Sequence, residues 1–526
     1  MPGIGPQRAD FRFPALGTGY RGEHSIAGLT EELYQSGYLY RLRNYHLIGR
    51  GRALKRRGST PYDVATIDGA NDVQALSMYE WDATRYLVAL CNGKVYKYDG
   101  TTPWSDISGA LAFGTSKDHR ARFTHFYDGS SKYLIGTGPN SGRLWKWSGA
   151  GNIAVLADTT GANPNYARDV AEFRGRLWVI NTQNGETLLQ YSDEQQSGVW
   201  SADRYIHCSR ESPGMGLCRH GQSTLLVFHQ RSVHALQFDY TAGTEPWSVQ
   251  PVDERIGAIA TNSIVYSKGA TYFASADGFY RVRNPARPAE YIGYPMEAVW
   301  AGLAQSRLPQ IEGFVRGEPW NEVVWLASNG ASTEHNLAFV WNTELETWSV
   351  FTGSFAYNCA INYVNSASKN VTLAGNYDSE IWNIWGDDNN DTGDRDGGSI
   401  GAVIESTFET GLLDFRYAGI KRLRDIWIDV LIRSSKSFDL QIQGINESPT
   451  VTTTQTVGTA GDRLSIDFIF DSSRFGSSDM PSQGQFRISS RARMFKLRMT
   501  ERNTGAPHTI NSLWFWFIPR ARRFTP

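Results

Sequence analysis

The chain has little of what marks secreted disulfide proteins and membrane proteins. Only four of its 526 residues are cysteines, too few for a disulfide scaffold of this length, so we expect buried free thiols. No apolar run reaches the roughly 18–20 residues that a membrane-spanning helix needs. The first residues also lack the basic-then-apolar order of a secretory signal, so we expect no export by that route.

A net charge of one sign is also missing. Lysine and arginine total 52, aspartate and glutamate total 53, and the formal net charge is −1. A protein this close to neutral has no overall electrostatic attraction to nucleic acid or to membrane surfaces. Together with the absence of long apolar runs, this balance predicts a soluble protein.

Glycine and aromatic residues are plentiful instead. The chain has 52 glycines, and Phe, Trp and Tyr make up 13% of it, a composition that favours short strands and tight turns over helices. From residue 73 onward one kind of unit repeats: an apolar strand, a glycine turn, a strand with alternating aromatic residues, and often a Trp-Ser pair. The units recur about every 50 residues. The tryptophans of the pairs are Trp104, Trp147, Trp200, Trp247 and Trp348.

A period of about 40–50 residues with three or four strands per unit is typical of β-propeller blades, because one small sheet cannot bury both of its faces alone. Residues 266–284 form a unit that lacks Trp-Ser, and residues 372–385 form a looser one. The repeat predicts an all-β fold with a propeller, and we favour six blades over seven. A set of unrelated β-sandwiches is the alternative.

Changes in composition divide the chain into four segments. Residues 1–65 match no repeat, and we expect an extended N-terminal arm there. Residues 66–386 carry the repeats of the propeller. Residues 387–400 are acidic and contain several glycines, which predicts a linker loop. Residues 401–526 contain longer strands with period-two alternation, which predicts a C-terminal β-sandwich.

Two groups of potential metal ligands have unfavourable spacing. A calcium loop would need its turn glycine one residue earlier and a glutamate at its twelfth position, where this chain has Gly398, so a solvated linker is the better interpretation. The zinc candidates fit no usual pair of cysteines separated by two residues. The calcium candidates are Asp387, Asn389 and Asp391, and the zinc candidates are His207, Cys208, Cys218 and His220.

Catalytic and cofactor motifs are also missing. No Gly-Lys is followed by Ser or Thr, as a phosphate-binding loop requires, and we predict no cofactor. Some propellers are glycosidases with carboxylates at the mouth of the axis; Glu172, Asp193 and Glu254 are candidates here, but the sequence cannot bring them together. The turn at residues 342–349 resembles the end of a kelch blade, which concerns blade packing rather than the choice of a partner. We therefore predict a protein without catalytic residues.

The strongest local charge signal is a basic segment at residues 41–57, where seven cations stand within seventeen residues. One interpretation is a solvated arm, and the other is an interface with phosphate or with an acidic partner surface. Interleaved tyrosines favour the interface, because Tyr and Arg are frequent in interface cores. The predicted interface residues are Arg41, Arg43, Tyr45, Arg50, Arg52, Lys55, Arg56 and Arg57.

Four stretches carry a resemblance to a known family. RLRNYHLIGRGRALKRRGSTPY (residues 41–62) is an Arg-rich segment that ends in a turn before the first blade, and SMYEWDATRYLVALCNGKVYKYDG (residues 77–100) is that blade. ESTFETGLLDF (residues 405–415) and KRLRDIWIDV (residues 421–430) follow the propeller as a C-terminal sandwich does. In these features the chain resembles the tail nozzle or hub proteins of short-tailed bacteriophages, also called tail tubular protein B or packaged-DNA stabilisation proteins.

This resemblance implies a structural virion protein without catalytic residues. It would form a homohexameric ring at the distal end of the tail, attach to the adaptor (the head-to-tail connector protein), surround the DNA path and retain the genome until ejection. Tail fibres or tailspikes and transient, non-specific contact with genomic DNA are the further partners it implies. Its location would be the virion tail, after assembly in the host cytoplasm.

The same resemblance gives the basic segment an expected role. A conduit should not bind a sliding polyanion tightly, so we expect this segment to contact the adaptor or a neighbouring subunit rather than DNA. Charge reversal at Arg41, Arg43, Arg56 and Arg57 is then expected to block attachment. The alternatives to a tail protein are a glycan-binding or glycoside-cleaving propeller and a kelch-like interaction propeller.

Overall fold

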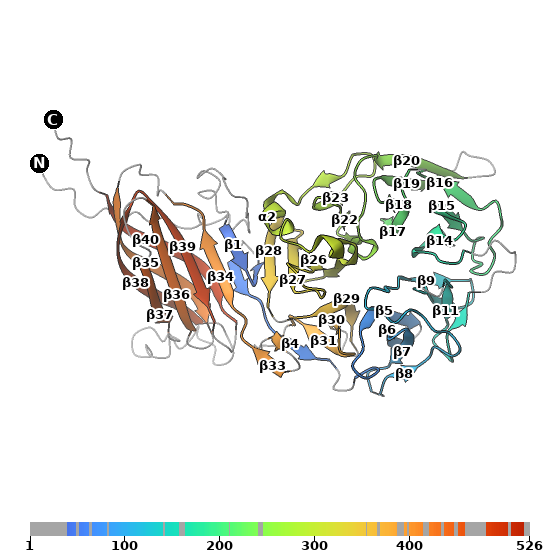
Figure 1. Ribbon diagram of the computed structural model, residues 1–526, viewed down its shortest axis with the longest axis horizontal. Helices are drawn as coiled ribbons and strands as arrows, with labels where there is room; N and C mark the ends of the chain where they lie inside the picture. The colour runs from blue at the N-terminus through green and yellow to red at the C-terminus, as the bar shows by residue number, and fades with distance from the viewer. Residues whose placement is uncertain are drawn as a thin grey trace, which may run out of the picture.

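A computed structural model describes residues 39–519, apart from the segments 49–51, 63–65, 82–83, 102, 140–141, 157–163, 210, 240–245, 354, 366–368, 387–393, 397–398, 414–419, 433–435, 446–450, 458–479 and 503–506. A ring of small sheets and a sandwich of longer strands lie side by side (Figure 1). Within these described residues the helical elements are short: α2 (Glu297–Trp300), η1 (Thr261–Ser263), η2 (Tyr294–Met296) and η3 (Gln305–Gln310). No described helix is long and apolar enough to cross a membrane.

Six separate four-stranded antiparallel sheets form blades of the ring, and we number them by chain position. Blade 1 consists of β5 (Val73–Trp81), β6 (Thr84–Cys91), β7 (Lys94–Tyr98) and β8 (Ser105–Asp106). Blade 2 consists of β9 (Phe123–Tyr127), β10 (Lys132–Gly136), β11 (Trp145–Trp147) and β12 (Ala154–Val155). Blade 3 consists of β13 (Asp169–Phe173), β14 (Arg176–Thr182), β15 (Gly185–Tyr191) and β16 (Tyr205–His207). Blade 4 consists of β17 (Gly214–His220), β18 (Thr224–His229), β19 (Val233–Phe238) and β20 (Trp247–Asp253). Blade 5 consists of β21 (Val265–Ser267), β22 (Ala270–Ala274), β23 (Phe279–Val282) and β24 (Glu290–Tyr291).

The sixth separate sheet, blade 7, is completed by a strand from the other end of the chain. It consists of β29 (Tyr357–Val364), β30 (Asn370–Asn376), β31 (Ile381–Ile384) and β4 (Ser59–Pro61). β4 pairs with β31 in antiparallel register, and β29 packs against β5 of blade 1, which closes the ring. Blade 7 corresponds to the looser repeat at residues 372–385. Its repeat is weak in the sequence because one of its strands comes from outside the repeat region.

One further four-stranded unit, blade 6, lies between blades 5 and 7 but is part of a nine-stranded sheet. Its strands are β25 (Glu312–Arg316), β26 (Glu322–Ala327), β27 (Leu337–Asn342) and β28 (Thr347–Thr352). The prediction of an all-β propeller is confirmed. Six separate sheets agree with the favoured number of blades, and the shared unit brings the number of four-stranded units around the ring to seven.

The repeated aromatic residues fill the space between blades. The ring centroids of Phe279 in blade 5 and Trp325 in blade 6 are 4.4 Å apart. Three tryptophans of the Trp-Ser pairs are almost fully buried: Trp147, Trp200 and Trp348. Aromatic side chains of the repeat therefore pack neighbouring blades against each other, which explains why they recur along the propeller.

The predicted C-terminal β-sandwich is confirmed, and it has two five-stranded layers. One layer consists of β1 (Leu39–Arg43), β34 (Ser406–Thr410), β39 (Met494–Glu501), β36 (Lys436–Ile445) and β37 (Val451–Val457), and it continues into blade 6 to make the nine-stranded sheet. The other layer consists of β2 (Tyr45–Ile48), β3 (Arg52–Lys55), β40 (Thr509–Pro519), β35 (Lys421–Ile432) and β38 (Met480–Ala492). Inward-facing apolar side chains such as Ile426, Ile428 and Leu440 fill the space between the layers.

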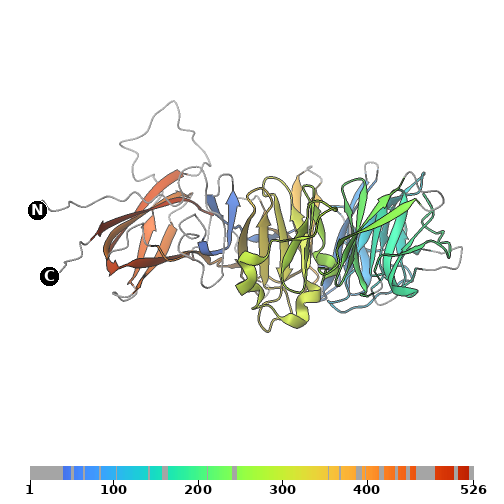
Figure 2. The ribbon, with the colours of Figure 1, turned by 90° about the horizontal axis from the view of Figure 1, so that it is seen from above.

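The expectation of an extended N-terminal arm is wrong for residues 39–61. β1, β2 and β3 belong to the sandwich, and β4 belongs to the propeller. β1 pairs with β28 of blade 6 on one side and with β34 on the other, so it joins the two regions in one sheet. In Figure 2 the blue N-terminal strands lie between the sandwich and the yellow blade. The reason is that apolar residues interrupt the cations: Leu42, Leu47 and Ala53 are buried in the sandwich core.

The predicted linker at residues 387–400 is described only in part. Residues 387–393 and 397–398, which include the calcium candidates, lie outside the described residues. The rest pairs as a small two-stranded sheet of β32 (Asp394–Asp396) and β33 (Ser399–Ala402). This part of the linker is therefore paired backbone rather than a loop. Residues 1–38, the start of the predicted arm, also lie outside the described residues.

Candidate functional site

Polar side chains from several blades meet at the axis of the propeller. Arg120, which precedes β9 of blade 2, places Nη1 3.2 Å from Oε2 of Glu312 on blade 6. Arg120 also donates to the backbone carbonyl of Asn358 on blade 7. Because blades 2 and 6 are not neighbours, the ion pair between Arg120 and Glu312 crosses the ring.

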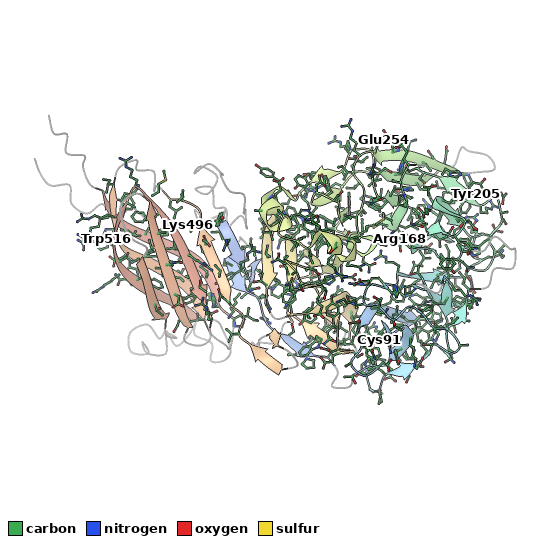
Figure 3. The ribbon with its side chains drawn as sticks, viewed as in Figure 1. Cys91, Arg168, Tyr205, Glu254, Lys496 and Trp516 are labelled. Carbon is green, nitrogen blue, oxygen red and sulfur yellow. The ribbon has the colours of Figure 1, made fainter. Side chains whose placement is uncertain are left out.

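Further contacts complete a group that we call the axial cluster: Arg120, Arg122, Arg168, Asp169, Asn262 and Glu312. Arg122 Nε lies 3.1 Å from Oδ1 of Asp169, and Asn262 Nδ2 donates to Oε2 of Glu312 at 2.8 Å. Arg168 donates through Nε to Oγ1 of Thr261 at 2.9 Å and lies near the centre of the ring (Figure 3). Paired side chains therefore span the axis at this level.

Burial controls ionisation around the axis. Burial raises the pKa of Glu312, although the charge of Arg120 opposes the shift. Burial, together with the charge of Arg120, lowers the pKa of His335 to about 3, so this imidazole is neutral near pH 7. Its two nitrogens lie 2.8 and 2.9 Å from the backbone oxygens of Tyr357 and Gln310. The carboxylates of Glu312 and Asp169 pair with Arg120 and Arg122, and the pair between Arg120 and Glu312 connects two blades that are not neighbours.

The basic segment provides a second group of buried charges, between the propeller and the sandwich. Lys55 is fully buried, and its Nζ lies 2.7 Å from Oε2 of Glu501 on β39. Tyr45 is also buried, and its hydroxyl lies 3.0 Å from Nε2 of His508. Two of the predicted interface residues therefore make contacts inside the sandwich of their own chain.

Arg56 connects the sandwich strands to the propeller. Its side chain is fully buried. Nε donates to Oδ1 of Asn44 at 2.7 Å, and Nη2 donates to the backbone oxygen of Thr352 on blade 6 at 3.0 Å. The guanidinium also lies 5.5 Å from the ring centroid of Phe355. Removing this cation would therefore break its hydrogen bonds to Asn44 and to the backbone oxygen of Thr352.

His46 completes this group of contacts, and sequence reasoning missed it. Its Nδ1 lies 2.7 Å from Oε1 of Glu322 on β26, and Arg316 Nη1 donates to Oε2 of the same carboxylate at 2.9 Å. All three side chains are almost fully buried. No sequence signal marks this triad, because His46 lies 276 positions from Glu322 along the chain. We call His46, Lys55, Arg56, Arg316, Glu322 and Glu501 the joint.

The protonation states in the joint follow from this arrangement. Burial lowers the pKa of His46, although Glu322 opposes the shift. Burial alone would raise the pKa of Glu322, but His46 and Arg316 outweigh it, and the pKa of this carboxyl is lowered. The joint therefore holds a carboxylate with Arg316, bonded to a neutral imidazole at neutral pH.

The remaining predicted interface residues divide by exposure. Arg41 is exposed, with Nε 3.9 Å from Oε2 of Glu409, and Arg52 is exposed as well. Arg43 is half-buried; Arg57 is half-buried too, and its Nη1 donates to the backbone oxygen of Gly386 at 3.2 Å. Arg50 lies outside the described residues. Of the predicted interface residues that the structure describes, only Arg41 and Arg52 thus present an exposed side chain to a partner.

The candidate acids of a glycosidase do not converge. Glu172 pairs with Arg219 at 3.1 Å, and Asp193 pairs with Arg204 at 3.3 Å, both on blade 3 or its contact with blade 4. Glu254 lies at the outer edge of the ring (Figure 3). Each is separate from the axial cluster, so none of them faces another across the axis.

The cysteines behave as expected for free thiols. None of the four forms a disulfide, and three are buried while Cys208 is half-buried. Burial raises the pKa of Cys91 to about 11 and that of Cys208 to about 12, which keeps both thiols protonated. Within the part of the chain that the structure describes, no group of His, Cys, Asp and Glu has the arrangement of a metal site.

No family model matches this chain, and no curated protein matches it either. Solved structures resemble it in part. PorZ of the type-IX secretion system of Porphyromonas gingivalis is 13% identical over 60% of this chain, with a TM-score of 0.35. YCF48 bound to D1 peptide is 10% identical over 63% of this chain and 98% of its own (TM-score 0.37).

An ancestral GH74 enzyme is 10% identical over 65% of this chain, with a TM-score of 0.42. The chain spans only 37% of PorZ and 50% of the GH74 enzyme. At this level of likeness none of the three bears on function.

Proposed function

We propose that this chain is a structural subunit of a viral tail, of the nozzle or hub type that the sequence resembles. The observation that carries the proposal is the nine-stranded sheet, which runs from blade 6 through β1 into the sandwich. Domains joined by a flexible linker move relative to one another by default. A backbone-paired sheet that crosses the boundary restricts that freedom, as a subunit of a rigid assembly requires.

The joint supports the same proposal. Lys55 with Glu501, and His46 with Arg316 and Glu322, are buried ion pairs or charge-assisted hydrogen bonds. Breaking such a pair costs about 3–5 kcal/mol, because the remaining charge stays buried without its partner. Any rotation of the sandwich against blade 6 would break the His46–Glu322 contact. The joint therefore favours one fixed orientation of the two regions.

The axial cluster adds a constraint on the DNA path. Arg120 and Glu312 meet across the propeller axis, so the axis of a single propeller is no open passage. A ring of such chains would leave its passage between subunits. DNA would then run past the outer surfaces of propellers and sandwiches.

Oligomeric state tests the proposal directly. Full-length protein is examined by mass photometry over a range of concentrations and by negative-stain microscopy. We expect closed rings, six-fold in the simplest case, with a central passage wide enough for duplex DNA. A protein that stays monomeric at every concentration and does not join adaptor-bearing heads contradicts the proposal.

The structure also sharpens the test of the adaptor interface. Reversal of Arg56, one of the substitutions expected from sequence to block attachment, would disrupt the joint itself. Arg41→Glu with Arg52→Glu changes only exposed side chains. We expect this double variant to fold with an unchanged melting temperature and to lose attachment to adaptor-bearing heads. If the folded variant attaches normally, the exposed arginines of the basic segment do not form the interface with the adaptor.

One observation favours a glycan-binding propeller as a second candidate. Trp81 and Tyr127 are 41% and 47% exposed, and their ring centroids are 5.7 Å apart. Exposed aromatic pairs are a common platform for a ligand with an apolar face, such as a sugar ring. A glycan array with the wild-type chain and with Trp81→Ala tests it. Binding that disappears in the variant supports this candidate, and an array without binding excludes it.

A further inference from the structure

Three arginines of the axial cluster come from two neighbouring blades. Arg120 and Arg122 immediately precede β9 of blade 2, and Arg168 immediately precedes β13 of blade 3. Arg168 is exposed and lies near the centre of the ring (Figure 3). Arg122 is 27% exposed. Two of the three guanidinium groups are therefore accessible to an ion from solution.

Hydrogen bonds connect Arg168 to Arg120 around the axis. Arg168 donates to Oγ1 of Thr261 at 2.9 Å. Asn262, the next residue in the chain, donates to Oε2 of Glu312 at 2.8 Å, and the same oxygen accepts from Nη1 of Arg120 at 3.2 Å. On the other side, Arg120 and Arg122 are two residues apart in the chain. The three arginines therefore belong to one connected group of side chains.

The carboxylates of this group already have their donors. Oδ1 of Asp169 accepts from Nε of Arg122 at 3.1 Å and from the backbone nitrogen of Val170 at 2.8 Å. Its Oδ2 accepts from the backbone nitrogen of Leu217 at 2.8 Å. Glu312 accepts the two side-chain donors described above. Neither carboxylate is thus reserved for the remaining arginine donors.

The guanidinium groups, in contrast, use few of their donors. Among the described residues, the only acceptors of their side-chain nitrogens bind Nη1 of Arg120, Nε of Arg122 and Nε of Arg168. Nε and Nη2 of Arg120 are buried and have no hydrogen-bond partner among the described residues. The side chain of Arg120 is only 9% exposed. A buried charged donor without an acceptor is unfavourable, so Arg120 favours a ligand that supplies acceptors.

The charges of the axial cluster favour an anion as well. Its three arginines share two carboxylates, and the nearby Asp118 accepts from both Nη atoms of Arg307 at 2.7 Å. Although Arg168 is exposed, the protein around it removes part of its hydration and lowers its pKa. Asp169 opposes this shift but does not cancel it. An additional negative charge beside Arg168 would therefore be stabilised.

We infer that the axial cluster binds a small tetrahedral oxyanion, such as inorganic phosphate, between the guanidinium groups of Arg120, Arg122 and Arg168. Guanidinium groups donate in pairs to oxyanions, and several such pairs need an anion with more than two oxygens. The ligand is a free ion rather than part of a polymer, because the pair between Arg120 and Glu312 crosses the axis. The inference is independent of the proposed function, since one chain supplies every residue.

Isothermal titration calorimetry on the full chain tests this inference. Sodium phosphate, sodium sulfate and sodium acetate are titrated separately, with sodium chloride keeping the ionic strength constant. We expect one phosphate or sulfate per chain and about tenfold weaker binding of acetate, which offers fewer acceptors to charged donors. Phosphate should also raise the melting temperature at constant ionic strength, because it binds the folded state.

Two variants locate the ion in the axial cluster. Arg168→Gln removes an exposed cation and should weaken phosphate binding about tenfold, since hydrogen bonds to charged groups are the stronger ones. Arg122→Lys keeps the charge beside Asp169 but loses the paired donors, and it should weaken binding to a similar extent. Arg219→Gln is the matched control, because it removes one exposed arginine that pairs with Glu172 outside the cluster.

We expect the control to bind phosphate as the wild-type chain does, and all three variants to keep the wild-type melting temperature without phosphate. Three results would overturn the inference. They are no phosphate binding by the wild-type chain, acetate binding as tight as phosphate binding, and an equal change of affinity in Arg168→Gln and in the control. The first two need no variant, so a folding defect in a variant leaves the test intact.

Discussion

The joint and the outer face of β35 and β38 both carry basic side chains, but the joint lies between the propeller and the sandwich, whereas the outer face belongs to the sandwich alone. In the joint each cation meets a carboxylate or a backbone oxygen of its own chain, as Lys55 meets Glu501. On the outer face of β35 and β38, Arg424 and Arg487 are exposed and form no ion pair among the described residues. A cation with an internal partner stabilises the fold, and a cation without one is available to a ligand.

The largest effect is expected in the joint. Glu322→Gln removes the carboxylate that His46 and Arg316 share, and it leaves the buried guanidinium without a counter-ion. We expect the free energy of unfolding to fall by about 3–5 kcal/mol, measured by urea denaturation. Glu405→Gln, which breaks the exposed pair with Arg502, should change it by less than about 1 kcal/mol. Equal losses of unfolding free energy in the two variants would mean that the buried ion pair of the joint stabilises the fold no more than an exposed pair does.

A pH titration should show the next largest effect. Burial holds the pKa of His335 at about 3 and that of His229 at about 4, below the usual value of about 6.5. Between these values the unfolded state binds protons that the folded state does not, so stability is complete above about pH 6.5 and falls as the pH drops. Each histidine should change the folding equilibrium about tenfold per pH unit.

The slope of stability against pH, from urea titrations at pH 7 to 5, separates this effect from simple destabilisation. His335→Gln should lower stability at every pH and also reduce the slope by about one proton. The exposed His207 offers the control, since His207→Gln should leave both unchanged. A variant with lower stability but the wild-type slope would show that His335 is not held neutral.

The smallest effect on stability is expected at the exposed end of the basic segment. Arg41→Gln breaks a contact of 3.9 Å with Glu409 in which Arg41 is 44% exposed. We expect a change in the free energy of unfolding of about 0.5 kcal/mol or less, whereas Lys55→Met should cost several times more, because it leaves Glu501 buried without its cation. Comparable losses of unfolding free energy would show that Arg41 and Lys55 contribute equally to stability, although one is exposed and the other is buried.

Much of the fold could be predicted from local patterns. The recurrence of Trp147, Trp200 and Trp348 marked the blades because each blade must present an aromatic face to its neighbour. The alternation in β35 marked a sandwich strand. The role of residues 39–61 could not be predicted, because β1 and β4 pair with strands more than three hundred positions away, and pairing at that distance leaves no periodic trace.

The candidate sites show the same division. The sequence predicted that the basic segment would matter, but it placed Tyr45, Lys55 and Arg56 at a surface, where the structure buries them. The sequence did not group Arg424 with Arg487, because they stand on two strands that are distant in the sequence and lie side by side only after β35 and β38 pair.

By itself the sequence determined the class of fold, the repeated unit and the place where the propeller gives way to longer strands, since these follow from hydrophobic period and turn chemistry along a short stretch of chain. Only the tertiary structure decided which cations are buried and which are exposed. The charge of a side chain is written in the sequence, but its ion-pair partner comes from a distant segment, as Glu501 does for Lys55.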